Sequence, residues 1–363
     1  MPHTGRPVTR IVSTLAAARA ATRARTARDK QRTGLSTAGV SVTLSLILVA
    51  VGIAILGFGA DVLVRGAVTI AHRARISTAV IGLTIVSMGT SLPELTVSVA
   101  ASLRGASDLS LGNVVGSNIF NIAIVLGLTA CLQPMRVHSS AVRLEWPFMF
   151  LASFQLLLLA RDGRIDRLEG AFFAIGIALF TAYVVRIGRT EVHGDEAADL
   201  AAEVRALEVR DGTAPAGKAM LLVAAGVGLL VLGGEVLLRG AIDLARAGGL
   251  SERIIGLTIV AAGTGAPELA TSLMAAYRGQ SEIALGNVIG SNIFNILGIL
   301  GVTALVQPIA VGSAIVGRDM VWMLVFSAML FPMMRKRSGV SRWDGGLLAV
   351  SYGVYLIIGV FGD

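Results

Sequence analysis

Charged side chains, cysteine and histidine are all scarce in this sequence of 363 residues. Charged residues make up 15% of the chain and hydrophobic residues 54%, whereas a soluble domain carries about 25% charged residues. The composition therefore excludes an ordinary water-soluble protein. The single cysteine, Cys131, excludes an intrachain disulfide, and the four scattered histidines indicate no zinc or haem site.

The excess of positive charge lies at the beginning of the chain. Residues 1–37 hold eight Arg and Lys residues against one acid, Asp29, and so account for +7 of the formal net charge of +8. We interpret 1–37 as a basic disordered tail and expect no nucleic-acid partner. The first long apolar run begins at Val40 and leads into motif-bearing sequence, which favours a first spanning helix over a signal peptide.

The rest of the chain consists of apolar segments of about the length that crosses a lipid bilayer. The strongly charged stretch 188–217 is the exception, and we expect it to be a solvated linker. The sequence predicts an all-α polytopic membrane protein with ten transmembrane helices. They are expected at about 41–64, 77–103, 109–132, 144–160, 168–187, 219–240, 254–277, 283–306, 314–334 and 343–361.

An internal repeat organises these segments. When the chain is shifted by 174 residues, Gly82–Pro134 aligns without a gap on Gly256–Pro308, and 32 of the 53 positions are identical. We therefore predict two five-helix repeats, 38–187 and 218–363, separated by the linker. An odd number of crossings inverts the second repeat, and binding sites in such folds lie near the midplane at discontinuous helices.

The second and seventh segments are predicted to be broken at mid-membrane. Each has a Gly and a Pro within a few residues at its middle, in GTSLPE (89–94) and GTGAPE (263–268). Proline removes a backbone donor and frees carbonyls, which are tolerated in a membrane only where they line a cavity. Each motif ends on a glutamate, Glu94 or Glu268, and a carboxylate at this depth indicates a functional site.

The third and eighth segments carry a matching polar pattern. They read LGNVVGSNIFNI and LGNVIGSNIFNI, so Ser117 and Asn121 share one helix face, as do Ser291 and Asn295. Hydrogen bonding between helices stays an open alternative role for Asn113 and Asn118 and their equivalents in the second repeat. Four glycines in these segments permit close helix approach: Gly112, Gly116, Gly286 and Gly290.

The ligand chemistry of these motifs is entirely oxygen: carboxylate, amide, hydroxyl and backbone carbonyl. Hard cations take such ligands, whereas soft metals prefer sulfur or nitrogen. The two glutamates give the site a charge of −2, which one Ca²⁺, sodium ions or protons can neutralise. A site that reorients with either load but not empty is an exchanger, so the charge balance fits antiport.

The doubled motif, GTSLPE/GTGAPE followed by GNVVGSNIFN/GNVIGSNIFN, resembles the repeats of the calcium/cation antiporter superfamily, and most nearly its prokaryotic sodium/calcium exchangers. The resemblance covers the chain from about residue 41 onward. It implies ten helices and ion sites formed by helices 2, 3, 7 and 8. It also implies alternating access, in which helices 1 and 6 slide across the core. Within these two helices, Asp61 with Arg65 and Glu235 with Arg239 are expected to form ion pairs at helix ends, with gating as the alternative.

The same resemblance assigns ligand roles. It implies that Glu94 and Glu268 bind Ca²⁺ together with the carbonyls of Thr90 and Thr264. Hydroxyls, backbone carbonyls and amides would bind Na⁺ or support the site. This supporting group comprises Ser87, Ser91, Ser117, Asn121, Ala261, Ser291 and Asn295.

Two positions depart from the family pattern. Some relatives have Asp at the position of Asn295, and its absence makes potassium coupling less expected. Gly265 stands where the family, like Ser91 in the first repeat, has Ser, so one hydroxyl ligand is missing.

These features lead to a ranked set of functions. The first is Ca²⁺/Na⁺ exchange. The second is exchange of Ca²⁺ or another cation for H⁺, because a buried glutamate pair can bind protons. A remote alternative is an intramembrane two-carboxylate hydrolase. We expect no enzymatic activity, no covalent cofactor, inorganic cations and the bilayer as partners, and a monomer sufficient for transport.

The distribution of basic residues predicts an orientation in the cell membrane. The positive-inside rule puts the 188–217 loop in the cytoplasm and both termini outside. The basic tail would then have to cross the membrane, and one explanation is that the native chain starts near Val40 or Val42.

Overall fold

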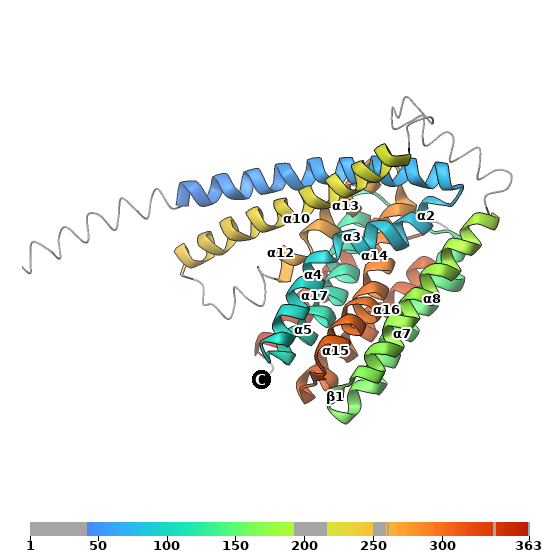
Figure 1. Cartoon of the computed structure of the whole chain (residues 1–363). Helices are drawn as coiled ribbons and strands as arrows, with labels where there is room; N and C mark the ends of the chain where they lie inside the picture. Colours follow the sequence, from blue (N-terminus) through green and yellow to red (C-terminus); the bar gives the residue numbers. More distant parts are fainter. Residues whose placement is uncertain (1–41, 192–215, 250–258, 260, 337–338, 362–363) are drawn as a thin grey trace, which may run out of the picture.

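The computed structural model describes residues 42–191, 216–249, 259, 261–336 and 339–361 (Figure 1). The tail predicted for 1–37 and most of the predicted linker 188–217 lie outside these residues. Almost all of the described chain is helical. Its strand pairing consists of β1 (Arg164–Ile165) antiparallel to β2 (Ile309–Ala310) and an isolated bridge between Met135 and Val340.

The first half of the described chain begins with a long N-terminal helix, Val42–Ala74. The elements that follow are α2 (Thr78–Ile81), η1 (Gly82–Val86), α3 (Ser87–Thr90), α4 (Leu92–Leu103), α5 (Ser107–Phe120), η2 (Asn121–Leu126), α6 (Gly127–Leu132), η3 (Ala141–Glu145), α7 (Trp146–Leu159), η4 (Ala160–Asp162) and α8 (Arg167–Glu191). The η elements, apart from the single turn η4, are π-helical stretches.

The second half begins with another long helix, α10 (Ala216–Ala247). It continues with α12 (Ala261–Thr264), α13 (Ala266–Tyr277), α14 (Ser281–Ile293), η6 (Phe294–Leu300), α15 (Gly301–Val306), η7 (Ile315–Asp319), α16 (Met320–Met334) and α17 (Arg342–Phe361).

Seven helices in the described part of the chain are long and apolar enough to cross a membrane. Helix Thr78–Thr90 and α4, which meet at a bend of 46°, together make an eighth candidate. The predicted count of ten spans stays a prediction.

Several predicted helix ends were too early. The N-terminal helix runs to Ala74 instead of 64, α8 to Glu191 instead of 187, and α10 to Ala247 instead of 240. In the N-terminal helix the reason is tertiary packing, because Ala67, Val68 and Ala71 beyond the predicted end are fully buried.

The N-terminal helix and α10 lie side by side and antiparallel, across the other helices (Figure 1). A Cβ atom added at Gly52 would lie 2.6 Å from the backbone nitrogen of Leu237, and one at Gly226 would lie 2.6 Å from that of Leu63. Only glycine allows so close an approach of two helix backbones. The contact, which we call the glycine seam, repeats every seven residues along both helices and contains Gly52, Gly59, Gly66, Gly226, Gly233 and Gly240.

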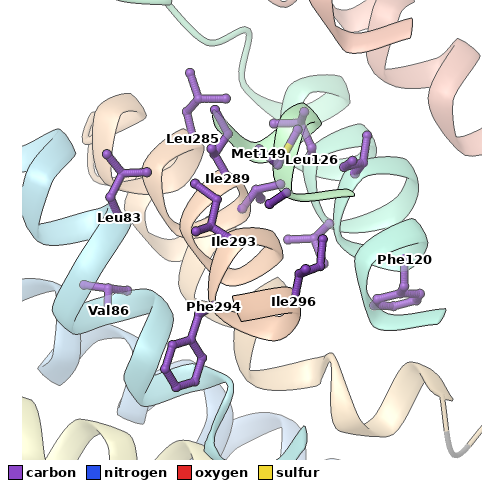
Figure 2. Close-up of a cluster of buried hydrophobic side chains, with 14 of the residues drawn as sticks. Leu83, Val86, Phe120, Leu126, Met149, Leu285, Ile289, Ile293, Phe294 and Ile296 are labelled. Atoms are coloured by element: carbon purple, nitrogen blue, oxygen red, sulfur yellow. The ribbon is translucent and has the colours of Figure 1, made fainter. Parts of the chain in front are cut away.

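The centre of the molecule is formed by Ser107–Leu132 and Ser281–Val306, the two most buried of the apolar helices. Ile289 and Ile293 of α14 lie in the buried cluster drawn in Figure 2. As predicted, glycine permits close packing here. A Cβ atom at Gly286 or Gly290 would come within 2.8 or 2.6 Å of a carbonyl oxygen in α2 or η1. For Gly112 and Gly116 no such contact is found among the described residues.

Candidate functional site

Two helix breaks define the site. The first lies at Ser91 (φ −85°, ψ 10°), between α3 and α4, and the second at Gly265 (φ −81°, ψ 3°), between α12 and α13. Pro93 and Pro267 occupy the first turn of the helix after each break, where the missing N–H is tolerated. Each proline cannot donate to the carbonyl four residues earlier, which is why the helix does not continue through the motif.

The two glutamates are the most deeply buried charged groups of the breaks. Glu94 and Glu268 lie in the first turns of α4 and α13, with 1% and 0% of their surface exposed. The partial positive charge at a helix N-terminus favours a carboxylate in this position. Ser91 of the first break is hydrogen-bonded to Glu268 of the second, so both broken helices contribute to one centre. Two buried carboxylates so placed need a positive charge to balance them.

A hydroxyl joins the two halves at this centre. The Ser91 hydroxyl donates to Glu268 Oε1 at 2.9 Å, so the first break supplies a ligand to the glutamate of the second. Position 265, the equivalent of Ser91, is a glycine and supplies no such group to Glu94.

Several buried oxygens have no hydrogen-bond partner among the described residues. They include Oε2 of both glutamates and the side-chain oxygens of three residues that the sequence predicted as ligands: Asn121, Ser291 and Asn295. Burying an unpaired oxygen is costly, and oxygens of this kind are the ligands of hard cations. These buried oxygens are therefore of the chemical type that binds Na⁺ or Ca²⁺.

An amide network holds the central helices in register. The Asn295 side-chain amide donates to Asn118 Oδ1 at 3.1 Å, and the Asn118 amide donates to the carbonyl of Asn292 at 3.4 Å. The interhelical role that the sequence left open for Asn118 is thus the observed one. Asn295 is held by its nitrogen, while its oxygen stays free of protein partners among the described residues.

The other predicted residues differ in how directly they join this centre. Thr90 ends α3 and donates to Asn287 Oδ1 at 3.2 Å, and Ser117 is buried in α5. Thr264 ends α12 at the second break. The Ser87 hydroxyl instead bonds to the carbonyl of Leu83 at 2.8 Å, within its own helix. Ala261 begins α12, and its side chain lies outside the described residues.

The hydrogen bonding between helices that the sequence left open for Asn113 and its equivalent Asn287 is also observed, although its partners were not predicted. Asn287 donates to the carbonyl of Glu268 at 3.4 Å and to Ser272 Oγ at 3.0 Å. Asn113 makes the same two contacts in the first half, to the Glu94 carbonyl and Ser98 Oγ. The signal was the repeated spacing, since a Ser follows each Glu by four residues and an Asn by 19. We call the hydrogen bonds of Asn113 and Asn287 the latch contacts. They fix each glutamate-bearing turn to the neighbouring helix.

Helix α10 passes over both breaks. A Cβ atom at Gly89 would lie 2.6 Å from Val227 Cγ2, and one at Gly263 would lie 2.6 Å from Leu238 Cδ1. The glycines of the two motifs therefore make room for side chains of a helix that covers the site.

The predicted ion pairs of the two long helices are present, but they lie within these helices and not at their ends, because both helices extend further than predicted. One pair has an additional partner. Asp61 pairs with Arg65 at 2.9 Å and also with Arg278, the residue that caps the C-terminus of α13. Glu235 pairs with Arg239 at 2.7 Å. Arg104 is the repeat equivalent of Arg278, and it has no ion pair within the described residues.

Known proteins share both sequence and fold with this chain. The profile of the family described as "Sodium/calcium exchanger protein" matches residues 44–186 and 218–361. The chain is 39% identical to the putative antiporter CaxA of Alkalimonas amylolytica, over 85% of this chain and 96% of that protein. It is 36% identical to the inner membrane protein YrbG of Escherichia coli (strain K12), over 86% and 96%.

A solved structure of the sodium-calcium exchanger NCX_Mj, soaked with 2.5 mM Na⁺ and 10 mM Sr²⁺, superposes with a TM-score of 0.73 at 31% identity. The match covers 87% of this chain and 98% of that one. The similarity therefore extends over nearly the whole described fold.

Proposed function

Because the chain belongs to the sodium/calcium exchanger family of multi-pass membrane transporters, we propose that it exchanges Ca²⁺ for Na⁺ across the membrane. The chain is a cation antiporter and not an enzyme, which removes the intramembrane hydrolase from consideration. The single observation that carries the Ca²⁺/Na⁺ proposal is the buried Glu94–Glu268 pair with its surrounding unpaired oxygens.

The charge of the site supports exchange of unlike cations. One Ca²⁺ balances the two carboxylates, and Na⁺ ions can balance them in its place. A buried centre with two uncompensated charges is costly to move within a membrane. The empty site therefore does not reorient from one side of the membrane to the other, whereas the loaded site does. This restriction couples the two ion fluxes.

We assign the ligands as follows. Glu94 and Glu268 bind Ca²⁺ with the carbonyls of Thr90 and Thr264. Na⁺ uses the Ser91 hydroxyl, already 2.9 Å from Glu268 Oε1, and the free side-chain oxygens of the central helices. The supporting residues are Ser87, Ser117, Asn121, Ala261, Ser291 and Asn295.

We further propose that ten spans form two inverted repeats, with the N-terminal helix and α10 moving together across the site. The glycine seam supports their movement as a pair, because it joins the two helices backbone to backbone. The absence of side chains at Gly89 and Gly263, where α10 packs on the breaks, supports movement over them. In the cell membrane, the 188–217 loop would lie in the cytoplasm and both termini outside.

Exchange of Ca²⁺ for H⁺ is the second candidate, and one observation favours it. Gly265 leaves Glu94 without the hydroxyl that Ser91 gives to Glu268. A buried carboxyl with fewer ligands for Na⁺ can be neutralised by a proton.

Ca²⁺ flux in proteoliposomes tests the proposal. We expect Ca²⁺ uptake to be driven by an outward Na⁺ gradient, and to be abolished in Glu94→Gln but not in the control Asp162→Asn, a change at an exposed residue of the turn η4. Uptake driven only by an outward proton gradient would establish the second candidate. Uptake that follows neither gradient and persists in Glu94→Gln would refute cation exchange at this site.

A further inference from the structure

The two halves of the site differ at two pairs of equivalent positions that surround a phenylalanine present in both halves. The break residue is Ser91 in the first half and Gly265 in the second. The helices that follow carry equivalent phenylalanines, Phe120 and Phe294, both labelled in Figure 2. Four residues after each phenylalanine, the first half has Ile124 and the second half has Gly298.

The ring of Phe120 occupies the space in which a side chain at position 265 would lie. A Cβ atom added at Gly265 would be 2.7 Å from Phe120 Cδ1 and Cε1, which is closer than non-bonded carbon atoms approach. A serine therefore does not fit at 265 while the ring stays in place. By equivalence with the Ser91–Glu268 bond, a serine at 265 would be expected to face Glu94, whose Oε2 has no partner among the described residues.

The equivalent ring in the other half lies elsewhere. Phe294 covers Gly298, where an added Cβ atom would be 2.6 Å from its Cδ2 and Cε2 atoms. The first half does not offer this space, because Ile124 has a β-branched side chain at the equivalent position. Tyr352 of α17 limits the ring of Phe120 further, with the ring centroids 6.0 Å apart in an edge-to-face contact.

We propose that Phe120, held against Gly265 by Ile124, determines the cation selectivity of the exchange site by filling the space in which a hydroxyl ligand beside Glu94 would otherwise lie. Phe120 and Ile124 act as positioning residues, since neither offers an oxygen to the cation. The inference rests on the proposed exchange at Glu94 and Glu268. Its consequence is a site with a good Na⁺ position beside Glu268 and a poor one beside Glu94.

Three variants of the full-length protein test the arrangement. In Gly265→Ser the new side chain meets the ring, so Ca²⁺ and Na⁺ binding should both weaken. In the double variant Ile124→Gly/Gly265→Ser the ring can move onto position 124, as Phe294 does onto Gly298, and the hydroxyl can reach Glu94. The variant Phe120→Leu/Gly265→Ser removes the ring instead. It replaces the first double variant as the test if Ile124→Gly impairs folding.

The primary measurement is the Na⁺ concentration at which half of the bound Ca²⁺ is displaced (the Na⁺ midpoint). Tryptophan fluorescence of the purified protein monitors this displacement. One added oxygen ligand should lower that midpoint about three- to tenfold in both double variants, with a higher Hill coefficient. Gly353→Ser is the matched control, because a Cβ atom there meets no atom within 4 Å.

The outcomes separate the inference from the proposed function. If the double variants bind Na⁺ no better than the wild type, the selectivity role of Phe120 is wrong. If Gly265→Ser alone gains as much as the double variants, Ile124 does not hold the ring. If instead the wild type carries no Na⁺-driven Ca²⁺ flux, the proposed function fails, and the comparison of Na⁺ midpoints still decides the inference.

Discussion

At the scale of single residues, the site depends on two carboxylates that protein groups only partly neutralise. Glu94 and Glu268 are fully buried, and each has one oxygen without a hydrogen-bond partner in the described structure. We propose that such groups are tolerated because they bind a cation, which makes their charge functional and not structural.

Replacing either glutamate by glutamine should therefore abolish Ca²⁺ binding while preserving the fold. Breaking a buried ion pair by removing one partner costs about 3–5 kcal/mol. The loss of one of the two carboxylates that balance Ca²⁺ should weaken its binding by a similar amount, which is more than about a hundredfold in affinity. Isothermal titration of the purified variants with Ca²⁺ measures this loss. A Glu268→Gln variant with wild-type affinity would exclude Glu268 as a ligand.

Asn287 should contribute more to stability than its equivalent Asn113. It makes both latch contacts and also accepts from Thr90 Oγ1 at 3.2 Å, so it ties the two broken helices together. Asn287→Ala should lower the free energy of unfolding by about 1–3 kcal/mol, and Asn113→Ala by less. Thermal unfolding in detergent compares them, and equal losses would contradict a bridging role for Asn287.

At the scale of helices, the glycine seam packs the N-terminal helix against α10 backbone to backbone, and we propose that the two move as one unit. Its glycines are needed for space and not for backbone conformation, since they lie within regular helices. Any side chain at these positions separates the two backbones.

A matched pair of substitutions in α10 tests the seam. A Cβ atom at Gly226 would lie 2.6 Å from the backbone of Leu63, whereas one at Gly228, two residues on, meets nothing within 4 Å. We expect Gly226→Leu to abolish transport or folding and Gly228→Leu to leave both nearly intact. Flux and size-exclusion profiles of the two variants make the comparison, and equal behaviour would show that the close contact is unimportant.

At the scale of the whole molecule, the two repeats differ in their ion pairs. The pair between Asp61 and Arg278 connects the N-terminal helix to the end of α13, whereas the equivalent Glu235 and Arg104 are not paired with each other. We interpret this as one orientation of a two-state carrier, in which the long helices exchange one ion pair for the other as they move.

Cysteine cross-links should trap the two orientations. The chain has one native cysteine, Cys131, so Cys131→Ser gives a background without thiols. Oxidation of Asp61→Cys/Arg278→Cys, and separately of Arg104→Cys/Glu235→Cys, should stop Ca²⁺ flux, and a reductant should restore it. Full transport by a cross-linked Asp61→Cys/Arg278→Cys protein would exclude the proposed movement.

The sequence by itself determined the features that depend on local chemistry and on repetition. A doubled motif shifted by 174 residues predicts the two broken helices and both glutamates, because proline, glycine and a mid-membrane carboxylate act through covalent structure and solvation. Membership of the exchanger family and the oxygen chemistry of the site follow from the same residues.

Only the tertiary structure decided which groups meet. The Ser91–Glu268 bond, the ring of Phe120 on Gly265 and the Asp61–Arg278 pair join residues 177, 145 and 217 positions apart. No local pattern specifies such contacts, since they depend on how the helices pack and on the rotamers that packing permits. The missing hydroxyl at Gly265 was visible in the sequence, but the ring that takes its place was not.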